Sequence, residues 1–326
     1  MPVHDLGYRK WGGIRAARFL RPLVIARGGI ALILKRRWLR IMLVLAWLPV
    51  LIPAFGIFAF EFSSTEPGLQ RFIVELVSQP LGRPDLGEMI LNDPETARHE
   101  VWSTLILTYF RYPQLFAMVG LIGLIAPLLI SYDLRTKAYL MYFSRPLSAT
   151  EYILGKSAVV WFFLGSVVTA PALLLYVLGV LLSPELSVVW QTWDIPLRIM
   201  AASLVLLIPT TTLAVVYSSL TAESRYATFA WFATWAMGFV AYHFLTITTA
   251  AMSGNGPPRP GRSMEGIDLD RWRLLSPYHT LGKVEAWVFG LDTTPASVAP
   301  AICVLVGITV AGFWIVRRRI IARLSV

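Results

Sequence analysis

Apolar residues gather along this chain into six long runs. They lie near residues 39–60, 113–132, 157–182, 197–220, 226–250 and 298–316. Each run has roughly the 20 residues that a helix needs to cross about 30 Å of hydrocarbon. Charged residues or clusters of proline and glycine bound each run. The pattern predicts an all-α polytopic membrane protein with six transmembrane helices.

Prolines interrupt several of these runs. They are Pro49, Pro53, Pro127, Pro171 and Pro209. A membrane helix tolerates proline where neighbouring helices satisfy the backbone groups that the proline leaves without a partner. We therefore expect kinks at these positions rather than breaks between spans.

The distribution of positive charge predicts the orientation of the spans. Ten Lys and Arg residues lie between Arg9 and Arg40, four lie in 133–156, and four lie between Arg317 and Arg323. Residues 61–112 instead hold four basic and eight acidic residues. Because basic loops stay on the cytoplasmic side, we expect both termini and the 133–156 loop to be cytoplasmic. The loops 61–112 and 251–297 are then expected outside.

Residues 1–38 form a basic segment ahead of a single six-span domain, 39–326. Basic residues in 6–37 alternate with Trp11, Phe19 and other apolar side chains, which favours an N-terminal interfacial helix attracted to anionic lipid. Paired glycines and Pro22 interrupt the segment, so a mobile basic tail is the alternative. The second outer loop becomes apolar at helical spacing over 275–290, which suggests a re-entrant or interfacial helix pair, or a small cap.

Composition agrees with a membrane protein. The 326 residues are 56% hydrophobic and 15% charged, with a mean hydropathy of +0.63, whereas a soluble domain has about 25% charged residues. The net charge of +10 follows the topology, so we do not expect nucleic-acid binding. The single cysteine, Cys303, provides neither a disulfide framework nor a thiolate metal site.

No set of residues predicts catalysis in this chain. The four histidines, at 4, 99, 243 and 279, lack the spacing of a helical zinc site. Gly155-Lys156-Ser157 resembles the end of a phosphate-binding loop, but Thr150 replaces its first glycine. We therefore expect no catalytic, cofactor or metal site. The central parts of the spans lack carboxylates, which argues against coupling to protons or sodium.

A stripe of small residues marks the fifth span. Ala230, Thr234 and Gly238 recur every four residues, a spacing that allows close helix packing in membranes. The stripe is either an intrachain contact or part of a dimer seam.

The loop between the second and third spans is the most informative segment. Residues 131–157 read SYDLRTKAYLMYFSRPLSATEYILGKS, longer than an ordinary helix-to-helix connection. Charged residues open it, an aromatic helix-like stretch follows, and the chain turns at Arg145-Pro146. Ser148 and Glu151 have the spacing of a capping box at the start of the next helix. This pattern predicts a short amphipathic element on which another protein can push.

This loop resembles that of permease subunits of bacterial type-2 ABC exporters. The matching positions are Asp133, the apolar run 139–143, Pro146-Leu147-Ser148, Glu151 and Gly155-Lys156. Lys137-Ala138 replaces the Gly-Thr common before the apolar run. The loop is most similar to the subgroup that includes gliding-motility and copper-maturation permeases.

The resemblance implies a six-span permease in the bacterial inner membrane, with a cytoplasmic coupling helix between its second and third spans. It would pair with a second copy or a similar permease, and two copies of a separate ABC ATPase would dock on the 133–156 loop. The implied polar docking contacts are Asp133, Arg135, Lys137 and Arg145. The implied apolar anchors are Tyr139 and Phe143, while Pro146 marks the turn and Glu151 and Lys156 support the adjoining helix.

Two other classes of function fit the membrane topology. A non-transporting anchor or assembly scaffold could use the same loop to hold a cytoplasmic partner. A membrane enzyme acting on lipid would need a catalytic set, which we do not find. An ATPase partner favours the exporter, whereas a partner without nucleotide-binding motifs favours the scaffold.

Overall fold

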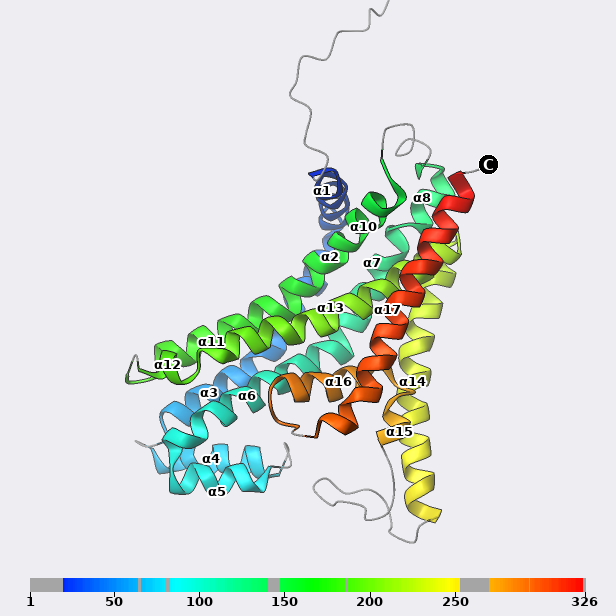
Figure 1. Ribbon diagram of the computed structural model, residues 1–326. Coiled ribbons are helices and arrows are strands. Elements are labelled where there is room, and N and C mark those ends of the chain that lie inside the picture. The colour runs from blue at the N-terminus through cyan, green and yellow to red at the C-terminus, as the bar shows by residue number, and fades with distance from the viewer. Residues whose placement is uncertain are drawn as a thin grey trace, which may run out of the picture.

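The computed structural model describes residues 20–63, 66–79, 83–139, 147–185, 187–252, 270–292 and 294–324. Within these ranges the chain is helical and contains no strand (Figure 1). Six of its helical segments are long and apolar enough to cross a membrane, which confirms the six predicted spans. They are Arg37–Glu61, Pro94–Thr136, Ala149–Leu182, Asp194–Leu220, Ser224–Thr249 and Pro295–Ala322.

The first three spans are each built from more than one helix. The first contains α2 (Arg37–Leu45) and α3 (Leu51–Glu61); the second contains α6 (Pro94–Pro113), α7 (Val119–Ile125) and α8 (Ser131–Thr136); the third contains α10 (Ala149–Leu164) and α11 (Ala170–Leu182). The other spans are the single helices α13 (Asp194–Leu220), α14 (Ser224–Met252) and α17 (Pro295–Leu324).

The remaining helices lie outside the spans. They are α1 (Arg21–Leu34), α4 (Pro67–Ser78), α5 (Pro84–Asn92), α12 (Val188–Gln191), α15 (Asp270–Arg273) and α16 (Pro277–Val288). Helix α16 confirms that the apolar stretch 275–290 contains a helix, as its spacing predicted.

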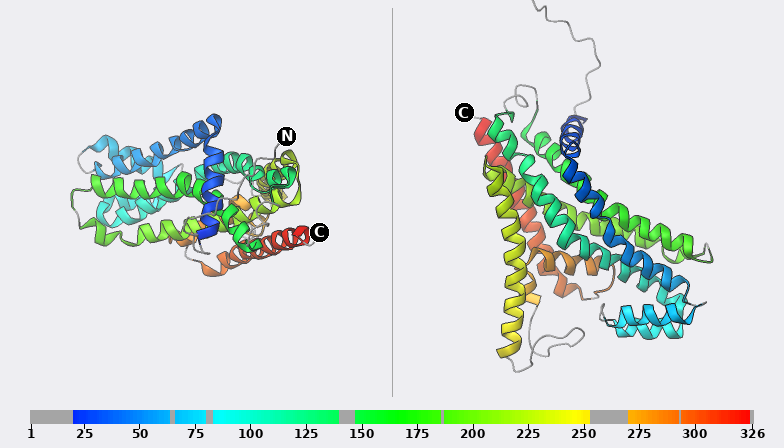
Figure 2. Two further views of the ribbon diagram at one scale, coloured as in Figure 1. Left: turned by 90° about the horizontal axis from the view of Figure 1, so that it is seen from above. Right: turned by 180° about the vertical axis from the view of Figure 1, so that it is seen from behind.

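The bundle has two ends, which we call terminal and distal. At the terminal end lie α8, the start of α10 and the C-terminal end of α17, with α1 crossing the bundle (Figures 1 and 2). At the distal end lie α4, α5, α12 and α15. The loops expected to be cytoplasmic and those expected outside therefore emerge at opposite ends.

The structure corrects the expected bounds of the first outer loop. Residues 94–112 were expected in the loop 61–112 but belong to α6, and α4 and α5 occupy much of the rest. The whole second helical segment has 43 residues, or about 64 Å of helix at 1.5 Å per residue. Hydropathy detects only the apolar part of such a helix, and polar and charged residues are interspersed between Pro94 and Arg111, which is why the apolar run begins 19 residues after Pro94.

Two prolines within the spans each leave a backbone carbonyl without its usual helical N–H donor. A hydroxyl group on a neighbouring helix donates a hydrogen bond to that carbonyl instead. Pro171 has no N–H to offer the carbonyl of Val167 four residues earlier, and the buried Tyr109 hydroxyl donates to that oxygen at 2.6 Å. Pro127 similarly leaves the carbonyl of Gly123, which accepts from Thr228 Oγ1 at 3.2 Å. These contacts fulfil the expectation that other spans stabilise the backbone beside proline.

Helix geometry changes near these prolines. A 3₁₀ turn at Ala126–Leu128 contains Pro127, and another at Leu48–Val50 contains Pro49. A π-helical turn, Gly165–Thr169, precedes Pro171 and contacts a second π-helical turn, Gln114–Met118, in the neighbouring span. By contrast, Pro53 and Pro209 lie within the continuous helices α3 and α13.

Replacing Tyr109 by phenylalanine tests the role of this hydroxyl. Tyr109→Phe keeps the ring but leaves the buried Val167 carbonyl without its side-chain donor, a loss of about 1–3 kcal/mol in unfolding free energy. Thermal unfolding in detergent, followed by tryptophan fluorescence, measures the change. Tyr176→Phe is the matched control, because that hydroxyl lies 3.5 Å from Thr192 Oγ1, at the limit of a hydrogen bond. Equal stability of both variants would contradict the assignment.

Candidate functional site

The roots of the 133–156 loop are held together by a buried ion pair. Lys156 Nζ, on α10, lies 2.7 Å from Asp133 Oδ2, on α8, and the two side chains are only 7% and 8% exposed. Tyr152, one turn before Lys156, donates its hydroxyl to the same carboxylate oxygen at 2.7 Å. Removing one member of such a pair leaves an uncompensated buried charge. The second and third spans are therefore joined where the loop leaves them.

A serine on the fourth span holds the start of α8. Ser218 Oγ accepts the backbone N–H groups of Ile130 and Ser131 at 2.9 and 3.0 Å, and Ser131 Oγ donates to the Ser218 carbonyl at 2.8 Å. Helix α8 has no side-chain cap of its own, so Ser218 satisfies donors that a helix start leaves open. We call Ser131, Asp133, Tyr152, Lys156 and Ser218 the loop-root junction.

The start of α10 is formed by the predicted capping box. Ser148 Oγ accepts from the backbone N–H of Glu151 at 3.2 Å, and the Ser148 N–H donates to Glu151 Oε2 at 2.7 Å. Two N–H groups at the helix start are thus paired reciprocally. The expected supporting role of Glu151 has a structural basis in this contact.

The burial of Asp133 corrects its expected role. The sequence suggested a docking contact, but the carboxylate is buried against Lys156 and Tyr152. An acid engaged inside the bundle positions the loop instead of offering a surface contact. Lys156, expected to support the adjoining helix, is the partner that makes this arrangement possible.

Other predicted docking residues remain at the surface. Arg135 and Lys137 are exposed, and the Arg135 guanidinium lies 5.5 Å from the centre of the Tyr132 ring. Tyr139 is half-buried. The remaining predicted contacts of the loop, Phe143, Arg145 and Pro146, lie outside the described residues.

Lys137 ends α8 in an unusual backbone conformation. Its φ of 56° and ψ of 20° lie in the left-handed region, which costs a residue with a Cβ roughly 1–2 kcal/mol. The backbone N–H of Ala138 then turns back to the carbonyl of Asp133 at 3.0 Å. The loop thus leaves the helix through a turn that glycine would adopt without strain.

Helix α1 packs directly across the start of α10. A Cβ on Gly155 would lie 2.8 Å from Ile25 Cβ and 3.0 Å from the Pro22 carbonyl oxygen, and one on Gly29 would lie 2.7 Å from Val159 Cγ2. Both glycines therefore permit a close helix crossing. On its other side α1 exposes Leu23 and Val24, an apolar surface compatible with the expected interfacial helix.

The small-residue stripe on the fifth span packs within the chain. Thr234 Oγ1 lies 2.7 Å from the Tyr217 hydroxyl of α13. A Cβ on Gly238 would lie 2.9 Å from the Leu275 carbonyl oxygen. Of the two alternatives for Ala230, Thr234 and Gly238, these contacts support the intrachain one, which leaves Thr234 and Gly238 unavailable for a dimer seam.

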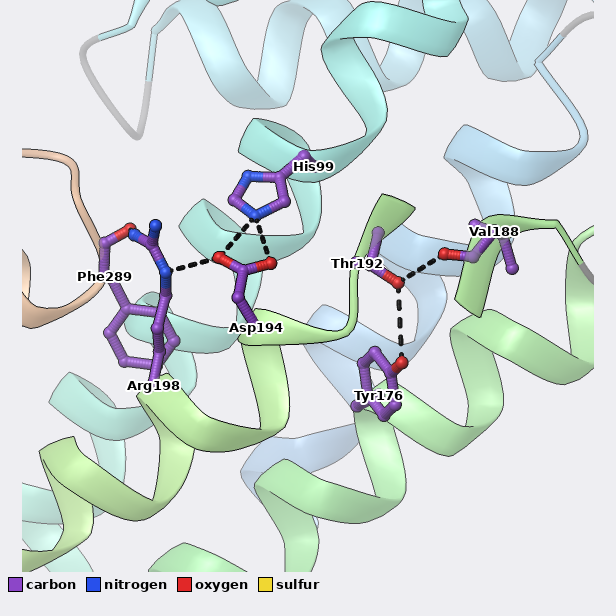
Figure 3. Close-up of polar contacts among 7 residues, drawn as sticks. All are labelled: His99, Tyr176, Val188, Thr192, Asp194, Arg198 and Phe289. Carbon is purple, nitrogen blue, oxygen red and sulfur yellow. Dashed lines mark hydrogen bonds and ion pairs between the residues drawn. The ribbon is translucent and has the colours of Figure 1, made fainter. Parts of the chain in front are cut away.

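A second polar cluster lies at the distal end (Figure 3). His99 Nε2 of α6 lies 2.9 and 3.0 Å from the two carboxylate oxygens of Asp194, and Arg198 Nε lies 2.7 Å from Asp194 Oδ2. Arg198 Nη1 also donates to the carbonyl of Phe289, just beyond α16. Gly290, with φ 78°, leaves the space that this guanidinium occupies. The cluster links α6, α13 and the end of α16.

The fold also gathers aromatic and histidine side chains that are far apart in sequence. His243 of α14 and His279 of α16 have ring centres 5.5 Å apart, and His279 stacks on Tyr242 at 3.7 Å. Spacing along one helix could not reveal this pairing, because His243 lies on the fifth span and His279 lies on a separate helix within the second outer loop. The described residues contain no group of three or more potential metal ligands from His, Cys, Asp and Glu.

Substitutions at the loop-root junction should be strongly non-additive. Asp133→Leu or Lys156→Met alone leaves a buried charge without its partner and should cost about 3–5 kcal/mol of unfolding free energy. The double variant removes both charges and should be more stable than either single variant. Thermal unfolding in detergent measures the cycle. Arg135→Met is the exposed control, and additive losses would show that the pair is not coupled.

Two adjacent glycines of α1 provide a matched test of the helix crossing. Gly29→Leu places side-chain atoms against the stiff Val159 side chain and should lower the melting temperature of the protein. Gly28→Leu should not lower it, because no atom lies within 4 Å of a Cβ at Gly28. Similar melting temperatures for the two variants would show that α1 does not pack on α10.

The chain matches no protein-family model and no curated protein sequence. Within the described residues, the structure shows six helical segments long and apolar enough to cross a membrane and a buried junction at the roots of one loop.

Proposed function

We propose that this chain is the permease subunit of an ATP-driven ABC exporter, with ATP hydrolysis carried out by a separate subunit. The observation that carries the proposal is the loop-root junction. Asp133 joins the second span to Lys156 of the third, and Ser218 joins the start of α8 to the fourth. A connector without a mechanical role would not need three spans fastened at its base.

The junction suits the transmission of force from a docked protein. Breaking a buried ion pair costs several kcal/mol, so displacement of the 139–147 segment would move α8 and the start of α10 together. Helix α1 lies across α10 at Gly155 and would move with it. Closure of an ATPase docked on this loop would therefore displace several spans together.

The backbone at Lys137 gives independent support. In the loop pattern that this chain resembles, Gly-Thr commonly precedes the apolar run where this chain has Lys137-Ala138. Lys137 adopts a left-handed φ of 56°, the conformation that glycine accepts most easily. Lys137 thus adopts a backbone conformation that a glycine at this position would accept without strain.

The adjoining π-helical turns offer places where the spans can bend. Gln114–Met118 and Gly165–Thr169 lie in neighbouring spans and contact one another. Such turns are commonly found at functional sites in helices. In the proposed cycle, the spans change which side of the membrane the path opens to by bending at this level.

The proposed assembly contains two copies of the ABC ATPase and a second copy of this permease or a similar one, surrounded by membrane lipids. The proposed location is the bacterial inner membrane, with both termini and the 133–156 loop on the cytoplasmic side. The terminal end carries the exposed cations Arg135, Lys137 and Arg225, in keeping with the positive-inside rule.

Charge reversal on the loop tests the proposed docking. The tagged full chain would be purified from its native membranes in a mild detergent, and co-purified proteins identified by mass spectrometry and ATP hydrolysis. Arg135→Glu with Lys137→Glu should reduce ATPase recovery by about tenfold or more, because like charges at an interface cost several kcal/mol.

Arg225→Glu is the matched control for this experiment. Arg225 is exposed at the same end of the bundle, with its side chain 76% exposed, but it belongs to the start of α14 and not to the 133–156 loop. Its reversal should leave ATPase recovery unchanged. Recovery of a cytoplasmic partner without nucleotide-binding motifs, and of no ATPase, would contradict the exporter and favour the scaffold.

A further inference from the structure

The distal end contains a cavity of about 430 Å³ between α6, α14, α15 and α16. This volume lies in the range of small-molecule sites. The lining includes Arg111, the aromatic rings of Tyr242 and His279, and the small residues Gly282 and Ala286. The cavity lies at the opposite end of the bundle from the loop-root junction. What it binds is therefore independent of ATPase docking on the 133–156 loop.

Arg111 is held in place by α16. A Cβ on residue 282 would lie 1.0 Å from Arg111 Nη1, so the glycine at this position leaves the space that the guanidinium occupies. Arg111 Cζ also lies 4.1 Å from the centre of the Tyr278 ring, a cation–π contact. Within the described ranges of the chain, no carboxylate forms an ion pair with Arg111. Its N–H donors are thus fixed at the cavity, in the planar arrangement that suits a carboxylate.

The other charged side chains of the lining already have partners. Lys283 Nζ lies 2.7 Å from Asp292 Oδ2, so these two charges compensate each other. Burial raises the pKa of Asp292, but hydrogen bonds from Lys283 and Thr294 outweigh this effect and lower it below its ordinary value. Arg273 is engaged by another group. The site therefore rests on Arg111, and Asp292 stays negatively charged in the same lining.

Tyr242 and His279 form a flat wall of the cavity. Their rings stack with centres 3.7 Å apart, and both side chains belong to the lining. Burial and, to a smaller degree, the nearby charges of Arg111, His243 and Arg273 lower the pKa of His279 to about 3. His279 is therefore neutral at physiological pH and adds no charge to the lining. It offers, with Tyr242, a surface on which a planar or apolar group can pack.

The walls are fixed to the rest of the bundle by the distal polar cluster. Arg198 of α13 donates to the carbonyl of Phe289 and pairs with Asp194, which also binds His99 of α6. Helix α16 therefore keeps its position relative to α6, the helix that carries Arg111. A preorganised site of this kind loses less entropy on binding than a mobile one.

We propose that this cavity binds an organic acid through a single carboxylate group, carried by a soluble molecule or by an amphiphile. Two parallel N–H···O bonds from Arg111 match the two oxygens of a carboxylate. The body of the acid then packs on Tyr242 and His279. A phosphomonoester, with a charge of roughly −1.5 to −2 at pH 7, would place a second negative charge near Asp292. A carboxylate has one charge, which Arg111 compensates.

Binding can be measured on the purified full chain without any partner. Benzoate, acetate and inorganic phosphate are titrated by calorimetry in detergent at constant ionic strength. We expect benzoate to bind most tightly, because its ring adds contacts with Tyr242 and His279, and phosphate to bind least tightly. In parallel, melting temperatures are compared in phosphatidylcholine nanodiscs that contain oleate or oleyl alcohol, which differ in the carboxylate.

The two arms of this experiment distinguish the sources of the carboxylate. Benzoate binding identifies a soluble acid. A rise in melting temperature with oleate but not with oleyl alcohol, in the absence of benzoate binding, identifies an amphiphile. The proposal is overturned if neither acid gives its response, or if phosphate binds detectably and at least as tightly as benzoate.

Substitutions of Arg111 test the guanidinium directly. Arg111→Gln removes its charge, and Arg111→Lys keeps the charge but loses the pair of parallel donors. We expect each to weaken benzoate binding by about tenfold or more, or to abolish the oleate response. Arg271→Gln is the control, because Arg271 is exposed and stacks on Trp272 at 4.5 Å. Equal binding by the Arg111 and Arg271 variants contradicts the site.

A second pair of variants tests the cavity without changing a charge. Ala286→Leu adds side-chain volume to the lining and should weaken binding by about tenfold or more, because it occupies the space of the ligand. Ala296→Leu makes the same change at an exposed position in the first turn of α17 and should retain binding. This pair decides if the Arg111 variants fail to fold, and equal binding by its two members overturns the proposal.

Discussion

The buried ion pair between Asp133 and Lys156 is the interaction on which the terminal end depends. It joins two spans at the base of one loop, and the Tyr152 hydroxyl and the Ser218 cap extend the connection. Two charges so far from water are stable together and costly apart. A loop built on this base cannot move without its spans, which is the property that a coupling element requires.

A second constraint is that every backbone group inside a membrane needs a partner within the protein. Pro171 and Pro127 each leave a carbonyl open, and Tyr109 and Thr228 from other spans donate to them. The same contacts tie the spans together near the π-helical turns. Where proline removes a backbone hydrogen bond from one span, a side chain of a neighbouring span therefore forms a hydrogen bond that connects the two.

Much of the fold could be predicted from sequence because the bilayer imposes a simple rule of length and hydropathy. The six runs correspond to six helical segments long and apolar enough to cross a membrane, and the spacing of Ser148 and Glu151 identified a real capping box. The start of α6 at Pro94 could not be found in this way, because that part of the helix has ordinary polarity. The site was only partly predictable: the motif selected Asp133 and Lys156 but not their burial against each other. Pairing across the fold, as between His243 and His279, leaves no local pattern.

The central claim is that α8, the start of α10 and the end of α13 respond as one unit when an ATPase acts on the loop. Hydrogen–deuterium exchange of the complex with its co-purified ATPase, with and without a non-hydrolysable ATP analogue, tests it most directly. The account predicts that the analogue changes exchange in 131–136, 149–156 and 216–220 together. A change confined to one of these segments, or none, would contradict it.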